Sequence, residues 1–128
     1  MLRRFNAKNL DGLATARTRP PVDKGGPAFT YTVLVPLFVI RGELARRVTD
    51  EDTLEQIYQM LTRHFGCTMG VKFGAEGGAE VKEMHRSFEV VAAVHADSDL
   101  YFRALRRELE AVTGERHVWI DRREIVLV

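Results

Sequence analysis

Two histidines and a glutamate in the second half of the chain have the spacing of one strand face. His85, Glu89 and His95 share the same parity, so a regular strand would place their side chains together, as a metal or acid–base site requires. At about 3.3 Å per residue, however, His85 and His95 would lie about 33 Å apart, too far for one metal ion bound from a single strand. The pattern therefore indicates partly exposed polar residues that remain candidate ligand contacts, with no metal ion assigned.

A glycine-containing stretch nearby offers the other candidate ligand site. Gly74, Gly77 and Gly78 do not lead from a strand into a helix, as a phosphate-binding loop does, so they predict a turn. The same glycines would let a mobile loop over about residues 74–84 close on a ligand, with charge from its flanking side chains. The complete set of candidate ligand-binding residues is Lys72, Lys82, His85, Arg86, Glu89 and His95.

The remaining histidines and the cysteine have the positions of structural residues. His64 stands near a predicted helix end, where it would complement the last carbonyl groups, and His117 precedes a predicted core strand. Cys67 follows the negative end of the same helix, which raises a thiol pKa and disfavours the nucleophilic thiolate. No catalytic residue and no cofactor is therefore expected.

A long first strand must position part of any such site. Residues 30–41 are apolar on both alternating rows, which predicts a strand that is covered on both faces. Pro36 cannot donate a hydrogen bond to a neighbouring strand, so it predicts a bend or bulge.

Two amphipathic helices are the clearest elements. One is expected over about residues 49–66 with Thr49 as its cap, and the other begins at Asp97 or Ser98 and closes at Gly114. Their apolar stripes should be buried. Within these stripes, Leu61 and Leu109 are predicted to be core positions.

Two further strands lie between the helices, over residues 67–73 and 87–95, with residues 74–86 projecting as a long hairpin arm. An apolar register pairs Phe73 with Phe88, whereas a tight glycine turn pairs Phe73 with Lys82. Both registers remain open. The last segment supplies a strand over residues 117–120, and residues 125–128 add a possible short one after a charged stretch.

The order of predicted elements is strand, helix, strand, strand, helix, strand. Right-handed crossovers turn this order into an α+β two-layer sandwich, with an antiparallel sheet and two helices on one face. Over about residues 29–128 the chain thus resembles the ferredoxin-like (βαββαβ) superfamily, by its pattern of elements alone. The hairpin and C-terminal strand are distantly similar to the trimeric PII signalling and copper-tolerance proteins, and the sequence to small bacterial proteins. The resemblance implies architecture only, because this fold hosts enzymes, sensors and oligomerisation modules alike.

Residues 1–28 are predicted to form a basic N-terminal arm, and residues 29–128 the folded domain. The arm holds six basic residues against Asp11 and Asp23, whereas the rest of the chain has more acidic than basic groups. A nucleic-acid partner is therefore disfavoured. One cysteine, and no N-terminal apolar segment of signal-peptide or membrane-span length, indicate a cytoplasmic protein without a membrane partner.

A non-enzymatic, homo-oligomeric binding or interaction module is the function that this sequence favours. The alternative is a small-molecule binder or enzyme whose pocket lies at a subunit interface, beside the hairpin over residues 74–86. A homodimer is expected because the sheet face that the helices leave open retains Val91, Ala93 and Trp119. The rival cover for that face is the arm, whose Leu2, Phe5, Leu10 and Leu13 could fold back over it.

Overall fold

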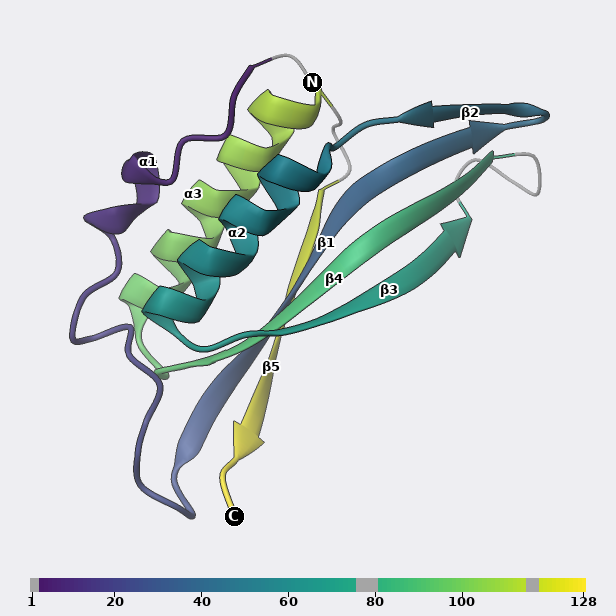
Figure 1. The fold of residues 1–128 in the computed structure, drawn as a ribbon. Coiled ribbons are helices and arrows are strands. Elements are labelled where there is room, and N and C mark those ends of the chain that lie inside the picture. Colours follow the sequence, from purple (N-terminus) through teal and green to yellow (C-terminus); the bar gives the residue numbers. More distant parts are fainter. Residues whose placement is uncertain (1–2, 76–80, 115–117) are drawn as a thin grey trace.

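A computed structural model describes residues 3–75, 81–114 and 118–128, with residues 41, 71–75 and 81–83 described as backbone alone (Figure 1). It contains five strands and three helices. In chain order these are α1 (Lys8–Asp11), β1 (Pro27–Arg41), β2 (Leu44–Arg47), α2 (Glu51–His64), β3 (Thr68–Ala75), β4 (Val81–Ala92), α3 (Ala96–Thr113) and β5 (Trp119–Val126).

The sheet is antiparallel and is built around β1. One side of β1 pairs with β4, and β3 pairs with the far side of β4. The other side of β1 is shared: β5 pairs with residues 27–34 and β2 pairs with residues 38–41. The two long helices, α2 and α3, lie side by side on one face (Figure 1). The strands curl into a half-barrel, which leaves the opposite face without a helix.

The predicted ferredoxin-like βαββαβ two-layer sandwich is therefore wrong. The chain has an extra strand, β2, which folds back on β1 so that Arg41 lies opposite Leu44. Gly42, the first of the two loop residues, has φ of +60°, a backbone conformation that glycine adopts without steric cost. With the extra strand, the order of elements after α1 is β-β-α-β-β-α-β, and the sheet curls into a half-barrel.

Pro36 lies in β1 where the strand changes partners. The register with β4 shifts between Pro36 and Phe38, so the predicted bulge is confirmed. Leu127 donates its backbone N–H to Gly26, which implies by alternation that even-numbered residues of β1 face β5. Pairing with β5 ends at Leu34 and the β2 pairing begins at Phe38. The absent N–H of Pro36 therefore falls in the gap and removes no ladder hydrogen bond.

Both helix caps differ from the expected residues. Asp50, not Thr49, caps α2 by accepting a hydrogen bond from the Thr53 backbone at 2.8 Å. His95, not Asp97 or Ser98, caps α3 by accepting one from the Asp97 backbone at 3.0 Å. The first change shortens α2 by one residue and the second lengthens α3 by two or three residues, so the buried stripes are unaffected.

The hydrophobic core lies between the helices and the odd-numbered row of β1. Leu61 and Leu109 are fully buried in it, which confirms both core predictions. This core contains aromatic as well as aliphatic side chains, and the aromatic ones include Tyr31, Phe88, Tyr101 and Phe102.

The β3–β4 hairpin has neither of the predicted registers. Phe73 lies opposite Met84, not Phe88 or Lys82. Residues 76–80, at the centre of the predicted mobile loop, lie outside the described residues, as does His117.

The N-terminal arm packs on the helices and not on the open face of the sheet (Figure 1). Phe5 and Leu10 are buried in the same core cluster as α2 and α3. Glu108 of α3, only 5% exposed, accepts hydrogen bonds from the Arg3 guanidinium and from the Asn6 backbone at 3.0 Å. The predicted cover of the open face by Phe5 and Leu10 is therefore wrong.

Candidate functional site

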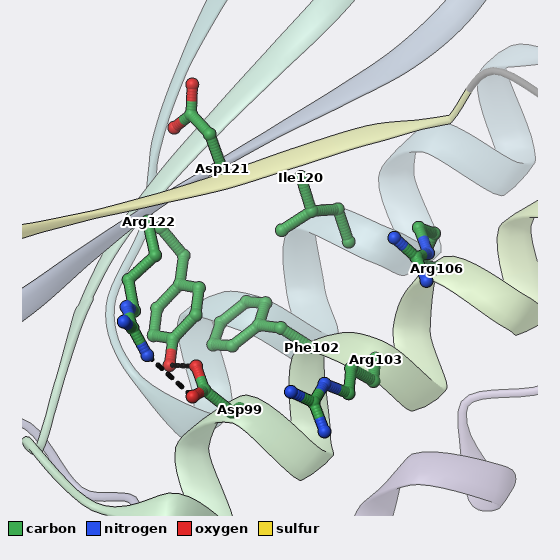
Figure 2. A pocket seen from close by; sticks show the side chains of 8 residues that line it. Asp99, Phe102, Arg103, Arg106, Ile120, Asp121 and Arg122 are labelled. Carbon is green, nitrogen blue, oxygen red and sulfur yellow. Dashed lines mark hydrogen bonds and ion pairs between the residues drawn. The ribbon is translucent and has the colours of Figure 1, made fainter.

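A cavity of about 350 Å³ lies between α3 and β5, on the helical side of the sheet (Figure 2). Strand β5 contacts α3 in this region, and the lining includes no residue of α2. The lining residues are Tyr31, Asp99, Phe102, Arg103, Arg106, Ile120, Asp121 and Arg122. The cavity therefore combines aromatic, aliphatic and strongly charged side chains.

The floor of the cavity is apolar and firmly packed. Tyr31 of β1 and Phe102 of α3 stack with ring centroids 3.8 Å apart and planes 14° from parallel. Both rings are buried in the core. Ile120, opposite Val33 in the sheet, adds an aliphatic wall. Such a floor favours a ligand with an apolar or planar body.

One carboxylate joins three elements at the base of the cavity. Asp99, in the first turn of α3, accepts hydrogen bonds from the Tyr31 hydroxyl and from Arg122 of β5, each at 2.6 Å. The Arg122 guanidinium also lies 4.3 Å from the centre of the Phe29 ring, a cation–π contact. Because both oxygens of Asp99 are engaged, this carboxylate holds the cavity in shape and offers little to a ligand.

Burial, and then the hydrogen bond to Asp99, raise the pKa of Tyr31 well above its usual range. The hydrogen bond that Arg122 donates to Asp99, opposed by partial desolvation, likewise raises the pKa of Arg122. Both groups keep their protons at every physiological pH. The protonated Arg122 can therefore attract negative charge at the base of the cavity.

The rim carries the positive charge. Arg103 and Arg106 stand three residues apart on α3, so they lie on the same side of the helix. Arg106 pairs with Glu110 at 3.5 Å. Arg103 has no ion-pair partner among the residues that the structure describes. Asp121 lines the cavity through its backbone, because its carboxylate points to the other side of β5 (Figure 2).

Arg122 is paired with Asp99 and Arg106 with Glu110, so Arg103 leaves an excess of positive charge at the cavity. Guanidinium groups bind carboxylates and phosphates through paired N–H donors. The arrangement is suited to holding an anion whose apolar part rests on Phe102 and Ile120.

The candidate ligand-binding residues predicted from the sequence are not brought together in one site. His85 and Glu89 share the open-face row of β4, opposite Pro36 and Thr32. Arg86 lies on the other row, facing the helices, with its guanidinium 3.9 Å from Glu51. His95 lies beyond the end of β4 as the cap of α3. Lys72 and Lys82 lie on β3 and β4, in the part described as backbone alone.

Two of the predicted interface residues lie on the open face of the sheet. Val91 lies opposite Thr30 and Trp119 opposite Leu34, about 13 Å apart along β1. Ala93 lies just beyond the end of β4. The interface itself stays a prediction.

The centre of this face is polar. Thr30 and Thr32 are buried there, although neither long helix lies over them. Arg123 of β5 and Glu89 of β4 approach to 3.9 Å across β1 and so cover the two threonines. The open face therefore has two threonine hydroxyl groups and an ion pair at its centre. It is not the continuous apolar patch that Val91 and Trp119 suggested.

The other singled-out residues lie away from the cavity. Burial raises the pKa of the Cys67 thiol to about 11, so the thiolate is disfavoured as expected. His64 lies between Tyr101, whose hydroxyl is 2.8 Å from Nδ1, and Asp11 of the arm at 3.3 Å. It therefore links the arm to both helices. The contacts that the structure gives His64 are to these side chains, whereas the predicted contacts were to the last carbonyl groups of the helix.

Sequence reasoning missed the cavity because its parts are far apart in the chain. Arg103 and Arg106 are exposed on α3, and the spacing of residues along that helix does not indicate that they face β5. Tyr31 carried the usable signal: a tyrosine in a strand predicted to be covered on both faces must find a polar partner for its hydroxyl.

Comparison with known proteins finds no matching family model, no matching curated protein and no matching solved structure. Within the described residues, no cluster of histidine, cysteine and acidic side chains has the geometry to hold a metal ion. None of the described helices has both the length and the apolar character needed to cross a membrane.

Proposed function

We propose that this chain is a binding module for a small organic anion, held in the cavity between α3 and β5. The observation that carries the proposal is Arg103, which has no ion-pair partner among the described residues and lies beside Arg106 above an apolar floor, next to an Asp99 carboxylate that already binds Tyr31 and Arg122. The ligand class is a carboxylate or phosphate ester with a planar apolar group. The predicted cytoplasmic location fits such a ligand and stays a prediction.

The size and rigidity of the cavity support this assignment. A volume of about 350 Å³ is at the small end of ligand pockets, which suits a metabolite-sized molecule. The Tyr31–Asp99–Arg122 network fixes the base before any ligand arrives. A preformed site loses less free energy in ordering its side chains when it binds.

A competing explanation is that Arg103 and Arg106 serve only solubility. Exposed arginines are common on helix surfaces and most have no ligand. The two explanations differ in what they predict for matched small molecules, because a solubilising arginine does not select between a charged probe and its neutral analogue.

Thermal unfolding with four probes tests the proposal: phenyl phosphate, inorganic phosphate, benzoate and neutral benzamide, at constant ionic strength. We expect phenyl phosphate to raise the melting temperature more than inorganic phosphate does, because the site binds the ring. We also expect benzoate to raise it more than benzamide does, because the site binds the negative charge. Constant ionic strength removes the general screening effect of added salt.

Two variants localise the effect. Arg103→Ala should abolish the stabilisation by phenyl phosphate, whereas Arg107→Ala should retain it. Arg107 is an exposed arginine of the same helix that does not line the cavity. Equal stabilisation of both variants, or no stabilisation of the unmodified protein by any probe, would refute the proposal.

A further inference from the structure

The outer edge of β5 is the second feature of the molecule that points to a partner. Within the described residues, β5 pairs only with β1, so its other edge presents backbone donors and acceptors to solvent. The strand is eight residues long and most of its side chains are exposed. An exposed edge of this length is a template for another strand unless it is blocked.

Alternation identifies the backbone groups that face outward. Leu127 donates to Gly26 at 2.9 Å, so the odd-numbered residues of this segment point their N–H and C=O groups toward β1. The even-numbered residues must then face the free edge. These residues are Ile120, Arg122, Glu124 and Val126.

The side chains of β5 have a charge order that suits a second copy of the same strand. Asp121, Arg122, Arg123 and Glu124 form a symmetric series of signs. In a two-fold antiparallel pair, only residues of equal parity lie opposite each other if both copies keep their helices on the same face. Two registers are centred on this series. One places Arg122 opposite Glu124, and the other places Asp121 opposite Arg123. The two-fold symmetry makes each of these pairs occur twice.

The two-fold axis passes through Arg123 in the first register and through Arg122 in the second. Each of these arginines is already paired with a carboxylate of the same chain. Arg122 is bonded to Asp99 at 2.6 Å, and Arg123 lies 3.9 Å from Glu89. Repulsion between the two copies of that arginine is therefore reduced. A run of charges of one sign, which is a common way to block an edge, would repel a copy in every register.

Apolar side chains flank the charged centre. Trp119 is 60% exposed and Val126 is 65% exposed. In the register that pairs Arg122 with Glu124, Ile120 meets Val126; in the other, Trp119 meets Ile125. Each arrangement covers apolar surface at both ends of the strand.

We propose that two copies of this chain associate through the outer edges of their β5 strands, antiparallel across a two-fold axis at Arg122 or Arg123. The two sheets become continuous, and the helices of both copies lie on one face. This inference rests on the edge of β5 and not on the anion site, and either can fail without the other.

A proline substitution at one outward-facing residue tests the proposal. Glu124→Pro removes an N–H from the free edge and leaves the ladder with β1 intact, whereas Glu124→Ala removes the same side chain but keeps the N–H. Light scattering over a range of micromolar concentrations should give twice the monomer mass for the unmodified protein. Glu124→Ala should weaken the dimer by less than about tenfold, and Glu124→Pro by more than about a hundredfold.

Amide exchange on the unmodified protein gives an answer if Glu124→Pro does not fold. The amides of Ile120, Arg122 and Glu124 should exchange slowly at high concentration and fast on dilution, while those of Asp121 and Arg123 stay protected throughout. A monomer at high micromolar concentration, an unaffected Glu124→Pro dimer, or exchange that does not depend on concentration would each overturn the proposal.

Discussion

The Tyr31 hydroxyl donates a 2.6 Å hydrogen bond to the Asp99 carboxylate and so ties the centre of the sheet to the first turn of α3. The two residues are 68 positions apart in the chain. Arg122 completes the contact from β5, also at 2.6 Å. The base of the cavity is thus one hydrogen-bonded unit contributed by three elements, which makes the cavity a fixed feature of the fold.

Removing the tyrosine hydroxyl should measurably weaken the fold. Tyr31→Phe keeps the stacking on Phe102 but leaves the Asp99 carboxylate with Arg122 alone. Because the acceptor is charged, we expect a loss of about 1.5 to 3 kcal/mol in the free energy of unfolding, measured with urea. A loss below about 0.5 kcal/mol would mean that this hydrogen bond does not hold α3 on the sheet.

The helical core positions should be sensitive to truncation. Leu61→Ala and Leu109→Ala each leave a cavity at a fully buried site, and each should cost about 2 to 5 kcal/mol. Leu100→Ala is the matched control, because Leu100 lies on α3 and is 53% exposed. It should change stability by no more than about 0.5 kcal/mol. Comparable losses at all three positions would contradict the assignment of the buried stripes.

Stability should depend on pH through His64. Burial, together with the nearby charge of Arg63, lowers the pKa of His64, and Asp11 offsets only part of this effect. The unfolded chain then binds the proton more readily than the folded one, so stability falls as pH drops below about 6.5. The free energy of unfolding, measured with denaturant at the unfolded pKa of about 6.5 and about one pH unit above and below it, should show this decline.

The control for this effect is His64→Gln, which keeps a polar group beside Tyr101 and cannot take up a proton. The difference in stability between the two proteins should shrink or change sign toward acid pH, by at most about 1.4 kcal/mol per pH unit. Parallel curves for the two proteins would show that His64 does not titrate differently on folding.

The N-terminal arm should detach when its anchor is neutralised. Burial alone would raise the pKa of Glu108, but hydrogen bonds from Arg3, Asn6 and Asn9 outweigh it and hold the pKa below its usual range. Glu108→Gln removes the charge that these donors share. Trypsin should then cleave after Lys8 faster than in the unmodified protein, as followed by mass spectrometry.

Glu55→Gln is the control for the arm, because Glu55 is an exposed residue of α2 that bonds only Gln59 in the described structure. Its cleavage rate after Lys8 should equal that of the unmodified protein. Equal rates for Glu108→Gln as well would show that the buried carboxylate does not retain the arm.

The helices could be predicted from the sequence because their signals are local. Leu61 and Leu109 belong to apolar stripes of regular spacing, and Gly114 marks a helix end with φ of +72°. The bulge at Pro36 was equally local. In contrast, β2 has only four residues, all exposed, so it offers no apolar alternation to detect. The curl of the sheet depends on which strands share β1, and that is a tertiary property.

In β5, charged residues led to a wrong prediction of where the strand ends. The charged residues 121–124 suggested a break between two short strands, yet β5 runs unbroken from Trp119 to Val126. An edge strand tolerates such residues because their side chains reach water. The convergence of Arg103 and Arg106 of α3 on Arg122 is likewise a tertiary property that the sequence pattern does not indicate.

A titration followed by nuclear magnetic resonance tests the anion site most directly. Phenyl phosphate added to labelled protein should shift the side-chain signals of Arg103 and Arg106 and the amides of Phe102 and Ile120, in a saturable manner. The indole signal of Trp119, on the opposite face of the sheet, should not move. Shifts that do not saturate, or that are as large at Trp119 as at Arg103, would contradict an anion site between α3 and β5.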